Sequence, residues 1–541
     1  MNIQKLIDNM TIEEKVGQMC VPILQKAVID DDIRKCIEEY DAGMLRYCPN
    51  AEYDGNSVAV GEPNTYFTAD QTAEFLNSAQ ALAKIPMFIA VDQEGSIRND
   101  LNRAGAFAYS GHMSFGAADD VDLTYKVAFE TGTEFAAMGI NLVQAPIVDV
   151  LAYSGRKTMK SASFGEDTDM VCRHALAMMK GFQAAGIAAM AKHFPGYGSV
   201  ATDAHKGLAE ITKDFRSLDD TDIKPLKTLF ANGLNGVMTG HVLTHCIDDE
   251  YPATMSAKMI TGYLRNTLGF DGIVETDAMR MPAIQNRYGT AFACVKAVAA
   301  GCDLLLLRGD IHHFEDGYYA VLNAVRNGEI SMDLINKSVT RILREKNRIG
   351  LLEKPFADPE KAKRLVGCAA HKETAARLAE NSVSLLKNTD LPLKPGEKIF
   401  VVCVEPQKLA AAEDSEQCVD MLYKAVKKRF SSAEGTVAAL SPTDEEIRSI
   451  TERAKAFDTI VIGTCNAILY EKQAELANSL LGLKKKVIVA AMDSPYDIEV
   501  LKNVKNYICT YGVAAASAKV CADILSDGAQ KIIVPPVTIN L

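Results

Sequence analysis

One short segment of the chain places several titratable side chains close together in the sequence. The apolar run 186–191 predicts a buried strand, and Lys192 and His193 follow it, then a Pro/Gly turn and, further on, Asp203 and His205. Loops after strands are where binding and catalytic groups commonly lie. Asp203 and His205 are two residues apart, so in an extended segment the carboxylate can orient the imidazole. Such a pair can act as a general acid and base, although a solvated polar loop has the same composition.

These groups need a framework that ends several strands at one place. The first two thirds of the chain alternates short apolar runs with helical patterns, which is typical of parallel β/α construction. The eight candidate strands cover residues 18–24, 43–48, 87–92, 140–145, 187–193, 236–241, 272–277 and 302–307. Several of them end in polar or acidic side chains, such as Asp92, His241 and Asp277. Active sites of eight-stranded barrels form at the C-terminal strand ends, so we expect an α/β fold with an N-terminal (β/α)8 TIM-like barrel; a doubly wound sheet would place its ligands at the same ends.

A second domain is expected after a charged stretch at residues 350–366. Apolar β-rich runs at residues 399–404, 459–463, 486–492, 507–511 and 532–534 alternate with helical segments. This pattern predicts a smaller C-terminal α/β sandwich domain. We expect the barrel over residues 1–352, a linker over 353–375 and the second domain over 376–541. No glycine-rich phosphate loop follows these strands, so nothing local indicates a nucleotide site.

Composition and charge exclude several classes of protein. The 541 residues carry a net charge of −12 without a basic cluster, which argues against nucleic acid as the main partner. No apolar run approaches the roughly 18 residues of a membrane-spanning helix. The N-terminus lacks the apolar core of a signal peptide, so we expect a cytoplasmic protein with no membrane partner.

Metal sites are not indicated by the cysteines or by the paired histidines. The thirteen cysteines include no Cys-x-x-Cys pair and lie mostly in apolar runs, which indicates buried thiols. His312 and His313 are adjacent, and in a strand-like segment their side chains face opposite ways, so we expect no shared metal.

Several segments, in a fixed order, resemble one family of enzymes. They lie at residues 11–19, 91–95, 139–142, 163–167, 192–205, 238–241 and 269–279, and the last reads Gly-Phe-Asp-Gly-Ile-Val-Glu-Thr-Asp-Ala-Met. Residues 380–388 resemble the opening of the same family's C-terminal α/β domain. The chain thus resembles glycoside hydrolase family 3, in its β-N-acetylglucosaminidase (β-N-acetylhexosaminidase) branch. The resemblance covers nearly the whole chain, and this many segments in one order are more specific than any single motif.

The resemblance implies a retaining, two-step glycosidase that removes terminal β-linked N-acetylglucosamine. Asp277 would attack the anomeric carbon and form a covalent glycosyl-enzyme. His205, paired with Asp203, would act first as the acid and then as the base, a role suited to a group with a pKa of about 6.5. No metal and no organic cofactor is implied. From the residues alone, Asp277 is equally a cap on the following helix.

The same resemblance implies which residues bind the sugar. Asp92, Lys192 and His193 match positions that bind the hydroxyls of the terminal sugar, a task suited to charged groups aimed into a small pocket. An internal ion-pair network at the strand ends is the alternative for these three. His241 is a further candidate ligand, or else a wall residue with its hydrogen bonds satisfied. The expected partner is a small carbohydrate, and no oligomeric state is predicted.

Two departures from the branch bear on sugar recognition. Ala162 stands where the branch usually has an arginine before its Ser-Phe-Gly motif, and Ser96–Asp100 stands where it usually has a second glycine and arginines. Arg98 is the candidate to supply the missing cation, with Arg156 and Lys160 as further candidates. The chain has no tryptophan, so stacking on a sugar face falls to Tyr or Phe.

Three other functions stay open. A phosphorylase would use phosphate in place of water in the second step, because a histidine acid presents no negative charge to repel it. A β-glucosidase or β-xylosidase of the same family would take its acid from a glutamate of the C-terminal domain. A sugar-binding protein without turnover would keep the barrel and lose the chemistry.

Overall fold

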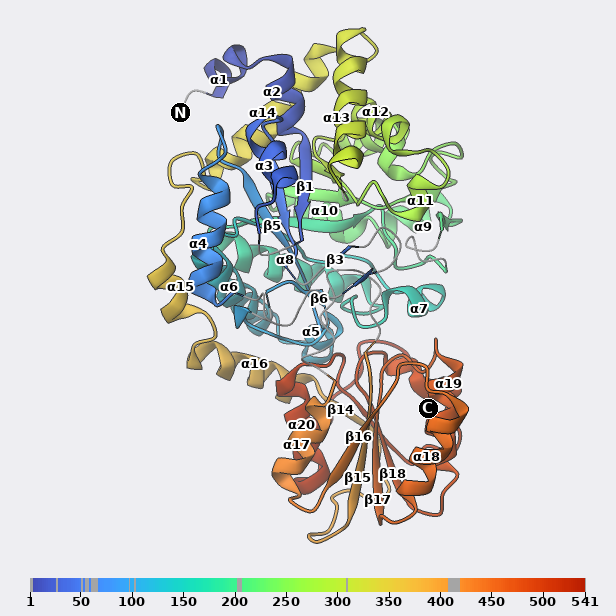
Figure 1. The fold of residues 1–541 in the computed structure, drawn as a ribbon. Helices are drawn as coiled ribbons and strands as arrows, with labels where there is room; N and C mark the ends of the chain where they lie inside the picture. Colours follow the sequence, from blue (N-terminus) through green and yellow to red (C-terminus); the bar gives the residue numbers. More distant parts are fainter. Residues whose placement is uncertain are drawn as a thin grey trace.

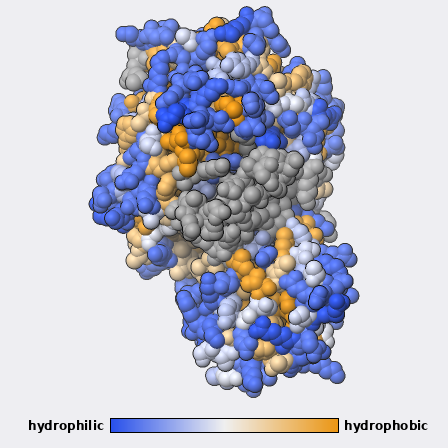
Figure 2. All heavy atoms as spheres, in the orientation of Figure 1, coloured by the Kyte–Doolittle hydropathy of each residue, from blue (hydrophilic) through white to orange (hydrophobic). Residues whose placement is uncertain are grey.

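The computed structural model describes residues 3–25, 28–49, 52–53, 58–59, 67–96, 98–101, 104–201, 207–307, 310–406 and 419–540. Figure 1 shows a barrel, which contains the N-terminus, and below it a smaller sheet domain coloured orange to red. Figure 2 shows that hydrophilic residues cover much of this face, with apolar residues scattered between them. None of the helices among these residues combines the length and apolar character that crossing a membrane requires.

Parallel strands form the barrel in the order β12-β10-β8-β7-β5-β2-β1-β13. Their bounds are β1 Cys20–Leu24, β2 Met44–Tyr47, β5 Phe88–Gly95, β7 Leu142–Gln144, β8 Ala188–Phe194, β10 Gly236–Thr239, β12 Ile273–Thr276 and β13 Leu305–Leu307. A backbone bridge between Glu275 and Leu304 joins the two ends of this order, so the barrel is nearly closed. All eight expected strands and the TIM-like barrel are confirmed, and an open doubly wound sheet is excluded.

Helices surround the barrel and connect its strands (Figure 1). They are α1 Ile3–Asn9, α2 Ile12–Gln18, α3 Asp31–Glu38, α4 Ala69–Gln80, α5 Met113–Ala118, α6 Val121–Ala137, α7 Arg156–Met159, α8 Thr168–Ala184, α9 Phe215–Asp220, α10 Lys224–Ala231, α11 Pro282–Gln285, α12 Thr290–Ala300, α13 Ile311–Arg326 and α14 Met332–Arg348, with a π-helix at Lys258–Thr267. Side-chain caps begin several of them: Asp120, Asp167 and Asp310 each accept a backbone N–H three residues further on. Short pairs complete this part: β6 Arg98–Asn99 on β5, β9 Ala209–Ile211 with β11 Val242–Thr244, and β3 Glu52–Tyr53 with β4 Val58–Ala59.

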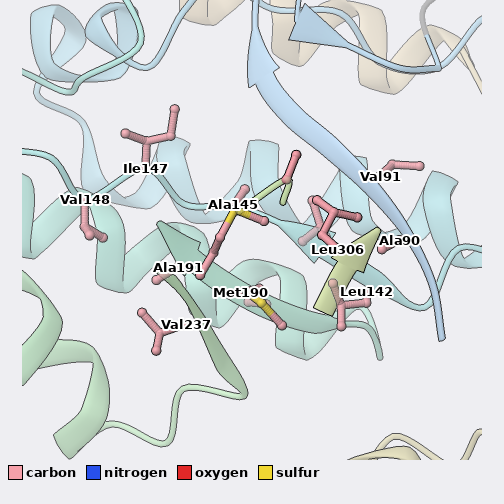
Figure 3. Packing of buried hydrophobic residues seen from close by; sticks show 14 of the residues in the cluster. Ala90, Val91, Leu142, Ala145, Ile147, Val148, Met190, Ala191, Val237 and Leu306 are labelled. Carbon is pink, nitrogen blue, oxygen red and sulfur yellow. The ribbon is translucent and has the colours of Figure 1, made fainter. Parts of the chain in front are cut away.

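Apolar side chains of neighbouring strands pack together in the barrel. Figure 3 shows this for Ala90 of β5, Leu142 of β7, Met190 of β8, Val237 of β10 and Leu306 of β13, each no more than 5% exposed. Parallel strands covered by helices are buried on both faces, which explains why they appear in the sequence as continuous apolar runs. Polar residues therefore concentrate where the strands end.

The second domain is a six-stranded sheet in the order β14-β19-β18-β17-β15-β16. The strands are β14 Ser384–Lys387, β15 Ile399–Val404, β16 Glu434–Ala438, β17 Thr459–Thr464, β18 Lys486–Ala491 and β19 Asn506–Cys509, and β14 pairs antiparallel while the others are parallel. The helices α17 Met421–Arg429, α18 Asp444–Ala454, α19 Glu471–Leu481 and α20 Ala515–Asp527 connect the strands, with a 3-10 helix at Pro495–Val500.

Four of the five strands expected in this domain are confirmed, and the one at residues 532–534 is wrong. That segment is irregular, with Ile532 97% and Val534 75% exposed, so its apolar side chains join no sheet. Val537 further along is buried, and Pro536 O accepts from the Glu166 N–H of the barrel at 3.2 Å. The tail therefore returns to the barrel instead of extending the sheet.

The charged stretch at residues 350–366 contains the helix α15 Pro359–Leu365, and a second helix, α16 Ala369–Ser382, follows it. Helix α15 packs against α4 and α6, and α16 packs against α5 and α6 of the barrel and α20 of the second domain. Buried Glu134 of α6 accepts from the Gly367 N–H at 2.9 Å and from His371 Nδ1 at 2.5 Å. The connection is thus tied to the barrel along its length.

Candidate active site

Asp277 lies directly after β12, at the C-terminal end of the barrel. Its backbone N–H donates to Thr239 O at 3.1 Å, and its Oδ1 accepts from the Ala278 N–H at 2.7 Å. The residue is half-buried, and the next helix begins only at Pro282, so helix capping is not its role. A carboxylate held in this way at a strand end has the fixed position that a nucleophile needs.

Asp92 of β5 lies at the centre of an ion-pair network. It pairs with Arg46 of β2 at 2.6 Å and with Lys192 of β8 at 2.6 Å. Glu94 extends the network to Lys192 at 2.5 Å, and Asp100 extends it to Arg46 at 2.5 Å. The side chains of Arg46 and Lys192 are each 4% exposed, whereas that of Asp92 is 22% exposed. The expected alternative of an internal ion-pair network is therefore present, and Asp92 is its most accessible member.

The network keeps Asp92 and Lys192 charged. Burial by itself raises the pKa of Asp92, but Arg46 and Lys192 outweigh it and hold that pKa below its ordinary value. Burial lowers the pKa of Lys192, but Asp92 and Glu94 outweigh it and raise that pKa well above the ordinary lysine value. An ionised Asp92 accepts hydrogen bonds from hydroxyls and a charged Lys192 donates them, so the pair is suited to binding a sugar.

His193, the last but one residue of β8, is oriented by Asp149. Its Nδ1 donates to Asp149 Oδ2 at 2.9 Å, because a carboxylate can only accept there. The other oxygen of Asp149 accepts from the Tyr197 N–H at 2.5 Å, and the Tyr197 ring packs edge-on against His193 with centroids 4.7 Å apart. The bond to Asp149 therefore fixes the orientation of the ring, and in the neutral imidazole it places the proton on Nδ1 and the acceptor on Nε2.

His241 is completely buried and has both ring nitrogens engaged. Its Nε2 donates to Ala278 O at 3.0 Å, because a carbonyl oxygen only accepts, and its Nδ1 lies 2.9 Å from Thr254 Oγ1. These contacts brace the residue that follows Asp277. His241 has the geometry of the wall residue that we weighed as its alternative, and its role as a sugar ligand stays a prediction.

The structure brings Asp277, Asp92, Lys192 and His193 to one end of the barrel. Strand β10 pairs with both β8 and β12, and its Met238 is level with Lys192 and with Glu275. Asp203 and His205 lie outside the described residues, as does the side chain of Arg98, whose backbone in β6 pairs with Gly95. The acid/base pair and the role of Arg98 stay predictions.

Glu275 is a buried carboxyl that the motifs did not single out. It is 0% exposed, and Gln144 Nε2 from β7 donates to its two oxygens at 2.9 and 3.0 Å. Burial raises the pKa of Glu275 to about 8; the charges of Asp92 and Asp277 add to this effect and that of Arg46 opposes it. At neutral pH a protonated carboxyl therefore lies two residues before Asp277.

Sequence reasoning gave no role to Arg46, Gln144 or Glu275. Arg46 lies in the strand Met-Leu-Arg-Tyr and Glu275 in Ile-Val-Glu-Thr, so a charged residue inside an otherwise apolar strand is the signal that would have found them. Asp149 follows the strand expected at residues 140–145, but its contacts with His193 and Tyr197 are visible only in three dimensions.

Metal ligation gains no support from the described residues, in which no group of three or more His, Cys, Asp or Glu side chains could hold an ion. The strand expected around His312 and His313 is wrong, because both lie in the first turn of α13. The side chain of His312 is 87% exposed and His313 is buried, so the two imidazoles still do not face each other.

The raised pKa of Glu275 predicts a pH-dependent cost to stability. Between pH 4.5, its ordinary pKa, and about 8, the folded state holds one proton more than the unfolded state, so the free energy of unfolding falls as pH rises. Glu275→Gln removes this titration. In urea unfolding at pH 5 and pH 8, the free energy of unfolding of the variant should rise relative to that of the wild type toward pH 8, by up to about 1.4 kcal/mol per pH unit. The exposed Glu329→Gln is the matched control; an equal difference at both pH values would contradict the prediction.

The sequence of the chain matches a family model, "Glycosyl hydrolase family 3 N terminal domain", over residues 11–345. Beta-hexosaminidase A of Pseudoalteromonas piscicida is 30% identical over 411 residues, which are 71% of this chain and 66% of that protein. A beta-hexosaminidase of Nitrosomonas eutropha is 30% identical over 250 residues, 45% of this chain and 71% of that protein.

A solved structure gives the same assignment over a greater length. The glycoside hydrolase family 3 beta-N-acetylglucosaminidase from Paenibacillus sp. str. FPU-7 superposes with a TM-score of 0.89, at 29% identity, over 98% of this chain and 99% of that one. Both domains are therefore matched, and the resemblance seen in the motifs is confirmed. The chain belongs to glycoside hydrolase family 3.

Proposed function

We propose that the protein is a retaining glycoside hydrolase that removes terminal β-linked N-acetylglucosamine. The observation that carries the proposal is the half-buried carboxylate of Asp277, fixed at the end of β12 beside the strand ends that hold Asp92, Lys192 and His193. Family membership supplies the reaction class, and the relatives named beta-hexosaminidase and beta-N-acetylglucosaminidase supply the sugar.

In the first step Asp277 attacks the anomeric carbon as the glycosidic bond breaks. Protonated His205 gives its proton to the departing oxygen, so that a neutral alcohol leaves and a glycosyl-Asp277 ester forms. In the second step neutral His205 takes a proton from water, whose oxygen attacks the same carbon and releases Asp277. Two displacements at one carbon retain its configuration.

Asp92, Lys192 and His193 hold the sugar for this attack. The ionised Asp92 and the charged Lys192 offer an acceptor and a donor 2.6 Å apart, which can engage two neighbouring hydroxyls. Asp149 fixes His193 so that Nε2 accepts from a third. Such fixed partners reduce the freedom of the bound sugar and favour a near-attack geometry.

The described residues place one carboxylate of the second domain, Asp493, in contact with the barrel, and it is not the glutamate that a β-glucosidase or β-xylosidase of the family would use. Asp493 meets the barrel loop at Ser161, and its two oxygens already accept from Ser161 Oγ and from Asn466 Nδ2. Each oxygen of Asp493 therefore already has a protein partner, and a glutamate of the second domain as the acid stays an open alternative.

Aryl β-N-acetylglucosaminide and aryl β-glucoside, each with and without inorganic phosphate, test the proposal. We expect faster aryl release from the acetamido sugar, with free sugar as the product whether or not phosphate is present. Sugar 1-phosphate would make the protein a phosphorylase. Preference for the plain glucoside would overturn the sugar assignment, and binding without cleavage would overturn the enzyme assignment.

Asp277→Ala should lower kcat about a thousandfold or more, because it removes the group that forms the covalent intermediate. The rate of aryl release from the preferred substrate measures this. Asp271→Asn, an exposed change at the opposite end of β12, is the control and should keep wild-type activity. A variant with Ala at position 277 that turns over within tenfold of the wild type would disprove the nucleophile.

His205→Ala should slow substrates according to how much their leaving group needs a proton. For an alkyl or disaccharide leaving group we expect a loss of about 10²–10⁴-fold in kcat/KM, the usual contribution of a general acid. For an activated aryl leaving group, which departs as a stable anion, the loss in kcat/KM should be much smaller. Equal losses in kcat/KM for both substrates would show that His205 is not the general acid.

A further inference from the structure

Strained backbone gathers where the second domain meets the barrel. Ser96 and Lys160 of the barrel have φ of 55° and 50°, and Asn466 and Tyr511 of the second domain have φ of 65° and 55°. Non-glycine residues seldom adopt this left-handed conformation, and it persists where surrounding contacts over-determine it, commonly at functional sites. All four follow strands: Ser96 follows β5, Lys160 lies in the connection after β7, and the other two follow β17 and β19.

Three backbone segments stack against one another at this junction. The Gly111 N–H donates to Tyr511 O at 2.8 Å, and a Cβ on Gly111 would overlap the carbonyl oxygen of Ser161. A Cβ on Gly512 would lie 2.9 Å from Gly111 N. Figure 1 shows α5 and α7, which flank these segments, on the side of the barrel that faces the second domain. No side chain fits between the segments, so the loop at Ser161 is held directly by its neighbours.

Asp493, just after β18, adds a hydrogen-bonded bridge across the junction. Ser161 Oγ donates to Asp493 Oδ1, and Asn466 Nδ2 donates to Asp493 Oδ2 at 2.8 Å. Ser161 is 4% and Asn466 1% exposed, so water competes little for either bond. A hydroxyl bonded to a carboxylate in such surroundings is among the stronger hydrogen bonds in proteins.

A path of contacts leads from Ser161 to His193, one of the proposed sugar-binding residues. Two residues further on, Ser163 Oγ donates to Asp149 O at 2.6 Å. The Asp149 carboxylate then holds His193 Nδ1 at 2.9 Å and the Tyr197 N–H at 2.5 Å. A shift of the loop at Ser161 would therefore move the residue that sets the orientation of the His193 ring.

We propose that Asp493 is a positioning residue through which the second domain fixes the sugar-binding site of the barrel. By holding Ser161 it sets the loop at residues 159–165, and through Ser163 and Asp149 it sets the orientation of His193. The inference rests on the proposed function, in which His193 binds the sugar. It gives the second domain a role in the affinity for sugar that requires none of its side chains to contact the substrate.

Asp493→Ala, Ser161→Ala, their combination and Ser517→Ala test this chain of contacts. The control, Ser517, donates to or accepts from Ser110 Oγ across the same junction at 2.8 Å but lies off the path that runs from Asp493 through Ser161 and Ser163 to His193. We expect Asp493→Ala and Ser161→Ala each to raise KM, and the dissociation constant of N-acetylglucosamine, about five- to tenfold with kcat little changed. The double variant should be no worse than Asp493→Ala, because both changes break one path. Ser517→Ala should match the wild type.

Two further variants separate positioning from general stability. Asp493→Asn keeps an acceptor for Ser161, and a rotated Asn466 amide can accept from its new N–H group, so we expect near-wild-type KM. In a protein that already carries His193→Ala, Asp493→Ala should raise KM by less than a further twofold. Equal effects of Asp493→Ala and Ser517→Ala, or independent effects of Asp493→Ala and His193→Ala, would overturn the proposal.

Hydrogen exchange reads the same contacts without relying on turnover. The amides of residues 159–165 and Tyr197 should exchange faster in Asp493→Ala and Ser161→Ala than in the wild type. In Ser517→Ala their exchange rates should equal those of the wild type. Unchanged exchange in all three variants would overturn the positioning role even if the enzyme cleaves its substrate. Faster exchange in the two variants, together with a wild-type protein that neither binds nor cleaves the sugar, would confirm the contacts and place the failure in the proposed function, and with it the effect on sugar affinity.

Discussion

The charges buried at the ends of β2, β5 and β8 constrain the rest of the site. Arg46 and Lys192 carry positive charge into a region almost closed to water, where a cation is tolerated only beside a carboxylate at hydrogen-bond distance. Asp92, Glu94 and Asp100 supply those carboxylates at 2.5–2.6 Å. Breaking one such pair leaves a buried charge without compensation, at a typical cost of about 3–5 kcal/mol. The pairing therefore fixes three strand ends to one another and fixes Asp92 where a sugar can meet it.

Two carboxyls of the β12 region show how surroundings assign different roles to one kind of group. Asp277 is half-buried and accepts the Ala278 N–H, which suits the role of nucleophile proposed for it. Glu275 is fully buried against the Gln144 amide, and burial raises its pKa to about 8, which suits a neutral group. The same barrel end thus holds one carboxyl that burial favours in its neutral form and one that lies closer to water.

The fold was predictable because buried parallel strands leave a continuous apolar record in the sequence, and all eight barrel strands carry it. Some parts of the second domain and of the candidate site could not be predicted, for separate physical reasons. Strand β16 has exposed positions and little apolar patterning, so the sequence did not predict it. Ile532 and Val534 are apolar residues in an exposed tail, so the sequence predicted a strand there that does not form. Asp92, Lys192 and Asp277 stood out because each follows an apolar run in the sequence, whereas Arg46 and Glu275 lie within the expected strands and find their partners on other strands. The contact between Asp493 and Ser161 joins residues more than 300 positions apart, which no local pattern can reveal. Asp203 and His205, predicted as the acid/base pair, lie outside the described residues.

Trapping the glycosyl-enzyme tests the central claim most directly. The protein would be incubated with a fluorinated N-acetylglucosaminyl substrate that forms the intermediate faster than it breaks down, and then digested and examined by mass spectrometry. The account predicts a mass increase of one sugar on the peptide that contains Asp277. Turnover of the substrate without any adduct, or an adduct on another carboxylate, would contradict it.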